Sequence, residues 1–261
     1  MSTPSAPSQA DVVTALRNAG CVFAEDEARL LVDASNGPGE LAAMVERRIE
    51  GVPLEQIVGW AEFCGRRVVV EPDVFVPRRR SELLVREAVA VTRPGALVVD
   101  LCCGTGAVGA AVAHAVREVE LHAVDSEPAA VRCARRNVAD VGGRVYEGDL
   151  YRPLLRDLRG RVDVIVANAP YVPTDSIALM PPEARVYEPR VALDGGADGL
   201  DIQRRVLAEA HDWLAPAGHV LIETGAPQAS STASAFTDNG LTPRIIGSEE
   251  LNGTVVVGCR R

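Results

Sequence analysis

Residues 98–109 read VVDLCCGTGAVG, an apolar run followed by a glycine-rich turn and a helix-forming stretch. Glycines in such a turn let the backbone approach a ligand closely. The spacing Gly104-x-Gly106-x-x-Gly109 also fits the dinucleotide fingerprint of dehydrogenases, so the glycines alone discriminate poorly. Asp100 stands ahead of them and would repel a pyrophosphate, which argues against a dehydrogenase.

Strand-like and helix-like segments alternate around this turn over residues 81–261. The alternation predicts an α/β fold with a Rossmann-like, seven-stranded, mostly parallel sheet. The last two strands are joined by a polar loop too short for a helix, so they should pair antiparallel. The segments that we expect to form strands are 97–101, 120–124, 144–146, 162–167, 219–223, 242–246 and 254–259.

Two smaller units precede the sheet. Apolar residues at helical spacing over 10–56 predict a small helical domain, and we expect this domain to serve substrate recognition. Residues 57–80 contain a short β-rich stretch, which predicts a hairpin linker. Residues 1–9 are rich in Ser, Pro and Ala and lack the basic start and apolar stretch of a secretory signal. We expect this segment to be a flexible tail and the protein to be cytoplasmic.

Composition excludes several classes of protein. No apolar run approaches the roughly 20 residues that span a bilayer, so no membrane association is expected. The formal net charge of -9 argues against stable nucleic-acid binding, which depends on Lys and Arg contacts to phosphates. The six cysteines are scattered and form no CxxC pair, so we expect no metal site and no disulfides. We expect the chain to act as a monomer.

Acidic residues stand at the ends of three successive predicted strands. Asp100 could accept a hydrogen bond from the amino group of a methionine moiety. Asp125 can hold both hydroxyls of a ribose, and Ser126 either assists it or caps the following helix. Asp149 could accept from an adenine amino group while Leu150 covers the ring. This order predicts S-adenosylmethionine as cofactor and S-adenosylhomocysteine as product. The predicted cofactor-binding residues are Asp100, Cys102, Gly104, Thr105, Gly106, Asp125, Ser126, Asp149, Leu150 and Asn168.

The strand 162–167 ends in Asn168-Ala169-Pro170-Tyr171, at the sheet edge where open α/β folds bind ligands. An amide nitrogen is a poor nucleophile, so an enzyme must position it and polarise its two N–H groups. The Asn168 side-chain oxygen and the Ala169 carbonyl can supply the two acceptors. Pro170 favours an extended Ala169, and Tyr171 offers a π-face to the target amide and the cationic sulfonium. We predict that these residues are catalytic.

With these residues, the chain resembles the HemK/PrmC-type protein-glutamine methyltransferases, which modify peptide-chain release factors, and their relatives that modify a ribosomal protein. The resemblance implies a protein substrate of one of these two kinds, methylated on the side-chain amide of a glutamine. It also implies that Asn168, Ala169 and Tyr171 bind the target amide, and that Glu188 and Pro189 belong to the substrate-facing loop. Further segments resembling family motifs are 53–59, 76–78, 187–193, 198–200 and 221–225.

The chain departs from the family pattern at two places. Ala169 replaces the first proline of Asn-Pro-Pro-Tyr, which keeps the carbonyl but lowers backbone stiffness. The family's Pro-Arg-Pro-Glu-Thr-Glu reads PRRRSE at 77–82, which hints at a different or more acidic partner.

Other interpretations stay open. A nucleic-acid base N-methyltransferase would stack a flipped base on Tyr171. A protein that binds S-adenosylmethionine without catalysing transfer is a second alternative. Glu223, at the end of a buried strand near the same edge, either supports the site from behind or is an ordinary strand-end residue.

Overall fold

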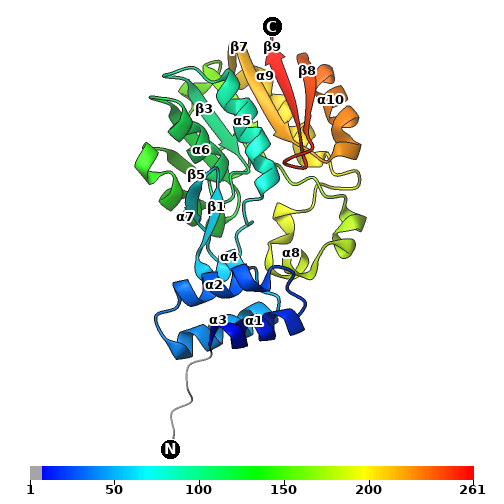
Figure 1. The fold of residues 1–261 in the computed structure, drawn as a ribbon. Coiled ribbons are helices and arrows are strands. Elements are labelled where there is room, and N and C mark those ends of the chain that lie inside the picture. Colours follow the sequence, from blue (N-terminus) through cyan, green and yellow to red (C-terminus); the bar gives the residue numbers. More distant parts are fainter. Residues whose placement is uncertain (1–7) are drawn as a thin grey trace, which may run out of the picture.

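A seven-stranded sheet forms the centre of the larger part of the molecule (Figure 1). The computed structural model describes residues 8–261. The strand order is β5-β4-β3-β6-β7-β9-β8, with parallel pairing from β5 to β7. Strand β9 runs antiparallel to both β7 and β8, so the predicted mostly parallel sheet is confirmed. The strands are β3 (Leu97–Leu101), β4 (Glu120–Asp125), β5 (Arg144–Glu147), β6 (Val162–Ala167), β7 (Leu214–Glu223), β8 (Leu241–Ser248) and β9 (Gly253–Arg260).

Strand β7 begins at Leu214, earlier than the predicted start at His219. The sequence between these residues contains a proline and a glycine and reads as a turn. In the structure these residues form a bulge within β7. Val162 of β6 pairs with Leu214 and Val164 pairs with His219, so the register shifts between the two pairs.

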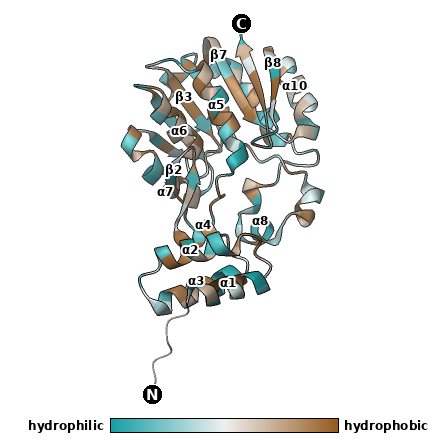
Figure 2. Ribbon diagram, viewed as in Figure 1, coloured by the Kyte–Doolittle hydropathy of each residue, from teal (hydrophilic) through white to brown (hydrophobic). Residues whose placement is uncertain are grey.

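Helices cover both faces of the sheet. Helices α5 and α6 pack on one face, and α9 and α10 pack on the other. Strand β3 is buried along its whole length, as expected for a strand covered on both sides, and Figure 2 shows it as mostly hydrophobic. The helices of this part are α5 (Glu82–Val91), α6 (Ala107–Ala115), α7 (Pro128–Asn137), α9 (Asp201–Trp213) and α10 (Ala229–Asp238).

The first helices pack around a separate apolar core, away from the sheet (Figure 1). Ser8 caps the first helix through a reciprocal pair of hydrogen bonds with Asp11, so the helix begins at Gln9. The prediction of a tail reaching Gln9 is therefore wrong at its end, and its first seven residues, 1–7, lie outside the described residues. The helices are α1 (Gln9–Asn18), α2 (Ala24–Ala34), α3 (Pro38–Ile49) and α4 (Leu54–Val58).

A short hairpin follows these helices, formed by β1 (Trp60–Phe63) and β2 (Arg66–Val69). Its two turn residues, Cys64 and Gly65, both have positive φ, which suits the twist of a two-residue hairpin turn. Asn137 of α7 accepts a hydrogen bond from the Val69 N–H at 2.8 Å and donates to the carbonyl of Thr105 at 2.9 Å. The hairpin is thereby attached to the glycine-rich turn.

A long segment between β6 and α9 connects the sheet edge to the N-terminal helices. Helix α8 lies in this segment, and the Tyr187 hydroxyl at its end donates to the carbonyl of Glu50 at 2.8 Å. Arg48 pairs with buried Glu27 and with Glu183 of α8. No helix within residues 8–261 is both long and apolar enough to cross a membrane. The remaining helical segments are η1 (Arg79–Ser81), η2 (Ala139–Val141), η3 (Arg156–Leu158), η4 (Thr174–Leu179), α8 (Pro182–Tyr187), η5 (Arg190–Ala192) and η6 (Ala226–Gln228).

Candidate functional site

A cavity of about 290 Å³ lies at the carboxyl ends of β3, β4, β5 and β6. The strand order reverses between β3 and β6, and such switch points are where open α/β sheets bind ligands. Most of the predicted site residues line this cavity, but Gly106 and Pro189 do not. The predicted residues that line it are Asp100, Cys102, Gly104, Thr105, Asp125, Ser126, Asp149, Leu150, Asn168, Ala169, Pro170, Tyr171 and Glu188.

Asp125 organises the glycine-rich turn. Its carboxylate accepts hydrogen bonds from the Gly104 N–H at 2.8 Å and from the Glu127 N–H at 2.9 Å. Burial raises the pKa of Asp125, and these two N–H groups oppose the rise. A carboxylate has about four acceptor positions, so capacity remains for two hydroxyl groups. Helix α7 begins at Pro128 with Glu127 at its cap position, so the alternative role of Ser126 as helix cap is wrong.

Asp100 is almost fully buried, with 1% of its surface exposed. It accepts one hydrogen bond, from the Gly109 N–H at 2.8 Å. A Cβ at Gly109 would lie 2.9 Å from the Asp100 carboxylate and 2.8 Å from Leu121, so only glycine fits there. Burial, reinforced by the nearby charge of Asp125 and opposed by the Gly109 N–H, raises the pKa of Asp100 to about 7. A cationic ligand group would offset this buried negative charge.

Two residues that line the cavity have a strained backbone. Cys102 has φ of 55° and Leu150 has φ of 49°, a region that costs non-glycine residues roughly 1–2 kcal/mol. Such strain concentrates at ligand-binding positions. Next to Leu150, both carboxylate oxygens of Asp149 lie 2.7 Å from the guanidinium of Arg205. The predicted adenine contact of Asp149 would therefore share this carboxylate with Arg205.

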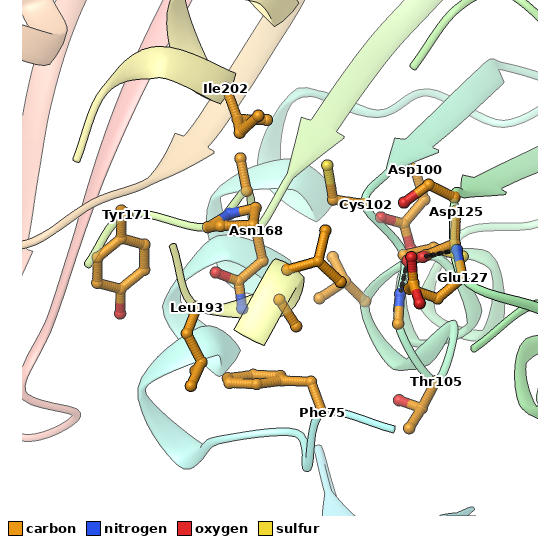
Figure 3. Close-up of a pocket in the computed structure, with 18 of the residues that line it drawn as sticks. Phe75, Asp100, Cys102, Thr105, Asp125, Glu127, Asn168, Tyr171, Leu193 and Ile202 are labelled. Atoms are coloured by element: carbon orange, nitrogen blue, oxygen red, sulfur yellow. Dashed lines mark hydrogen bonds between the residues drawn. The ribbon is translucent and has the colours of Figure 1, made fainter. Parts of the chain in front are cut away.

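The tetrapeptide after β6 lies across the cavity from the acids, with Cys102 between them (Figure 3). The Asn168 side-chain N–H donates to the Ser81 hydroxyl at 3.2 Å. The Tyr171 hydroxyl donates to Glu223 at 3.1 Å. Burial and the charge of Glu223 raise the pKa of the Tyr171 hydroxyl far above its usual range, so this group stays protonated. Both side chains are thus anchored from behind the cavity.

The protein engages one oxygen of the Glu188 carboxylate, while the other, Oε2, is buried and has no hydrogen-bond partner within the described residues. Its side chain is buried, and Oε1 accepts from the Val76 N–H at 3.1 Å and from Arg78 at 2.7 Å. Burial raises the pKa of Glu188, while the Arg78 charge lowers it. The residue therefore fixes segment 76–78 at the cavity, and the substrate contacts predicted for Glu188 and Pro189 stay predictions.

Several residues that line the cavity escaped the sequence analysis. Phe75 and Leu193 lie side by side at the bottom of the cavity in the view of Figure 3, and Ile202 lies at the top, opposite them. Phe75 directly precedes segment 76–78, which resembles a family motif, so its position in the sequence could have indicated that it lines the cavity. Ile202 and Arg205 lie on α9, and nothing in the local sequence distinguishes them from other helix residues.

Comparison with known proteins assigns the chain to a family. Residues 67–180 match the model of the methyltransferase small domain. The chain is 39% identical over 213 residues to the release factor glutamine methyltransferase of Geobacter sulfurreducens, covering 80% of this chain and 74% of that protein. The chain belongs to the family of release factor glutamine methyltransferases.

Family membership confirms the resemblance predicted from the motifs, and it implies S-adenosylmethionine as the methyl donor. Another relative is named for a different acceptor. The chain is 37% identical over 203 residues to the 4-amino-L-phenylalanine/4-methylamino-L-phenylalanine methyltransferase of Streptomyces pristinaespiralis, covering 75% of this chain and 69% of that protein. A solved methyltransferase structure from Pyrococcus furiosus matches with a TM-score of 0.56 at 16% identity, covering 84% of this chain and 98% of that one, which supports the fold alone.

Proposed function

We propose that this protein methylates the side-chain amide nitrogen of a glutamine in a peptide-chain release factor, with S-adenosylmethionine as donor. The observation that carries the proposal is the position of Asn168 and Ala169. They lie at the carboxyl end of β6 and line the same cavity as Asp100 and Asp125. Cofactor acids and amide acceptors therefore share one cavity. The release factor glutamine methyltransferases among its relatives support the choice of substrate.

The protein groups act by positioning. The Asn168 side-chain oxygen and the Ala169 carbonyl accept the two N–H groups of the target amide, which aims the nitrogen lone pair at the methyl group. The Tyr171 ring bounds the acceptor side and offers its π-face to positive charge. Bound S-adenosylmethionine would supply an electrophilic methyl group to the amide nitrogen, with the S–C bonding pair left on sulfur and the surplus nitrogen proton released to water.

The acids of the cavity suit the three parts of this donor. Asp100 is buried with a single hydrogen bond, so a ligand ammonium would neutralise a charge that the protein leaves uncompensated. Asp125 retains acceptor capacity for a ribose diol. Asp149 and Leu150 lie at the end of β5, where the adenine would sit. The remaining cofactor contacts proposed are Cys102, Gly104, Thr105 and Ser126 in the turns after β3 and β4, Asn168 after β6, and Gly106, the N-cap residue of α6.

The helical domain, residues 10–56, is proposed to recognise the release factor, with 57–80 as linker and 81–261 as the methyltransferase domain. Helix α8 supports this division of labour, because it contacts the helical domain through Arg48 and is followed by Glu188, which lines the cavity. We propose that the protein works as a monomer in the cytoplasm, where release factors act.

The test is transfer of radiolabelled methyl from S-adenosylmethionine to the purified release factors of the source organism, with mass-spectrometric localisation. Label on one glutamine amide is the expected result. A parallel reaction contains free 4-amino-L-phenylalanine, and another contains ribonuclease-treated and untreated lysate. Label confined to the free amino acid or to nucleic acid would overturn the proposed substrate.

A matched variant separates the acceptor side from the cofactor side. Asn168→Ala should abolish transfer while S-adenosylmethionine affinity, measured by calorimetry, changes only slightly, because nine other proposed cofactor contacts remain. If transfer and affinity fell together, the assignment of Asn168 to the acceptor amide would be wrong.

A further inference from the structure

A buried carboxylate lies directly behind the acceptor side of the cavity. Glu223 ends β7, the neighbour of β6, and only 1% of its surface is exposed. Its Oε1 accepts the Tyr171 hydroxyl at 3.1 Å and lies 3.4 Å from Nε of Arg80. The Arg80 guanidinium also lies 5.9 Å from the centre of the Tyr171 ring. One carboxylate thus holds a catalytic side chain and is neutralised by a cation.

Ser81 connects the same carboxylate to Asn168. The Ser81 residue is 1% exposed, and its hydroxyl accepts the Asn168 Nδ2–H at 3.2 Å. Its hydroxyl also faces the Glu223 carboxylate and, together with Arg80 and Tyr171, opposes the rise that burial causes in the Glu223 pKa. Oε2 of Glu223 is buried and has no hydrogen-bond partner within the described residues, so it is an open acceptor for the proton of the neighbouring Ser81 hydroxyl.

The direction of these hydrogen bonds decides how the Asn168 amide is turned. An ionised carboxylate only accepts, so the Tyr171 and Ser81 hydroxyls must both donate to it. A Ser81 hydroxyl that has donated its only proton presents lone pairs to Asn168. Asn168 must then turn its Nδ2 toward Ser81. If Oδ1 faced Ser81 instead, two acceptors would repel each other and neither would have a hydrogen bond. Its Oδ1 consequently points away from Ser81, on the side of the cavity.

We propose that Glu223 is a positioning residue for methyl transfer: through Ser81 it fixes the Asn168 amide with Oδ1 toward the acceptor nitrogen, and it anchors Tyr171 directly. The proposal rests on the proposed function, since only an acceptor with N–H groups needs Oδ1 in that direction. Arg80, which stands where the family pattern has an acid, supplies the cation that favours the ionised form of this carboxylate.

The decisive variant is Glu223→Gln, which keeps the size of the side chain. A glutamine can turn its amide to donate to Ser81, which lets Ser81 donate to Asn168 Oδ1 and brings Nδ2 to face the acceptor. The kcat should fall about 100-fold, the typical effect of removing one preorganised hydrogen-bonding group. The S-adenosylmethionine affinity and the acceptor KM should change less than about threefold, because the shape of the cavity is retained.

Ser81 gives the matched pair. Ser81→Ala removes the connection and should lower kcat to a similar extent, whereas Ser81→Thr keeps the hydroxyl and should retain most of it. A readout independent of activity is the side-chain amide resonance of Asn168 in protein labelled with ¹⁵N-asparagine. It should shift in Glu223→Gln and Ser81→Ala but stay close to the wild type in Ser81→Thr.

Several outcomes would overturn the proposal: near-normal kcat in Glu223→Gln, equal losses in Ser81→Thr and Ser81→Ala, or a parallel loss of cofactor affinity, acceptor binding and thermal stability, which marks a general structural role. An unchanged Asn168 resonance in Glu223→Gln would also refute it. If the wild-type protein methylates no release factor while the resonances shift as stated, the orientation stands and the proposed substrate fails.

Discussion

The buried carboxylate of Asp100 should lower the unfolding free energy of the protein by an amount that depends on pH. Burial raises its pKa from the ordinary value of 3.8 to about 7. A tenfold change in proton affinity corresponds to about 1.4 kcal/mol, so this difference amounts to roughly 4 kcal/mol. The penalty applies to the protein without S-adenosylmethionine, because the cofactor's ammonium would pair with the charge.

The sign follows from which state binds the proton more tightly. A raised pKa means that the folded protein keeps a proton that the unfolded chain has already lost. Stability from this group therefore falls as pH rises from about 4 to 7, and the penalty is complete above pH 7. Asp100→Asn cannot ionise, yet its side-chain oxygen can still accept from the Gly109 N–H. Any cost of its unpaired Nδ2 is about 1–3 kcal/mol and does not vary with pH.

The measurement is urea unfolding of wild type and Asp100→Asn at pH 4, 6 and 8 without cofactor. The difference in unfolding free energy, variant minus wild type, should rise by roughly 4 kcal/mol between pH 4 and 8. Asp198→Asn is the control: hydrogen bonds from Arg204 lower the pKa of Asp198, so its contribution changes mainly below pH 4 and its variant-minus-wild-type difference should not rise between pH 4 and 8. A flat difference for Asp100→Asn would refute the reasoning. The variant should also lose measurable S-adenosylmethionine binding.

Three further predictions test other parts of the molecule. Asp125→Ala should weaken S-adenosylmethionine binding by about 1–3 kcal/mol in calorimetry, the cost of leaving buried polar groups unpaired, and unchanged affinity would contradict the ribose contact. Arg48→Met leaves buried Glu27 without its cation and should lower the unfolding free energy by about 3–5 kcal/mol, whereas the double variant with Glu27→Leu should recover most of it; a double variant as unstable as the single one would contradict the ion-pair account. Ala169→Pro removes no hydrogen bond that the Ala169 N–H makes in the described part of the chain, so steady-state assays should show retained transfer, and urea unfolding should show a gain of up to about 1 kcal/mol. Loss of transfer in that variant would count against a purely carbonyl role for residue 169.

The sheet and the acids at its edge were predictable because their signal is local. Each strand is a short apolar run, and its last residues fall at the carboxyl edge whatever the loops do. Asp100, Asp125 and Asn168 could therefore be assigned to one cavity before any contact was known. The end of the N-terminal tail was missed for the opposite reason, since composition outweighed the capping pair of Ser8 and Asp11.

Contacts between distant segments were beyond the sequence. Glu188 accepts from Val76 although the two are far apart in the chain, and Asn168 meets Ser81 across a similar gap. Nothing in the local pattern around these residues indicates the partner, because the pairing depends on how the segment after β6 folds back over the sheet edge. The sequence could not decide between a supporting and an ordinary role for Glu223 either, because its partners Tyr171 and Arg80 come from distant segments.

The same contacts explain how the chain tolerates alanine at position 169. A proline there would stiffen the tetrapeptide from within. Here the stiffness comes from outside: Gln228 donates to the Tyr171 carbonyl at 2.9 Å, and the Val172 N–H donates to Leu193 at 3.0 Å. With Asn168 and Tyr171 also anchored by their side chains, the Ala169 carbonyl is fixed by its neighbours on both sides. The absence of the proline therefore removes a preference of the backbone and leaves in place the geometry that we propose binds the amide.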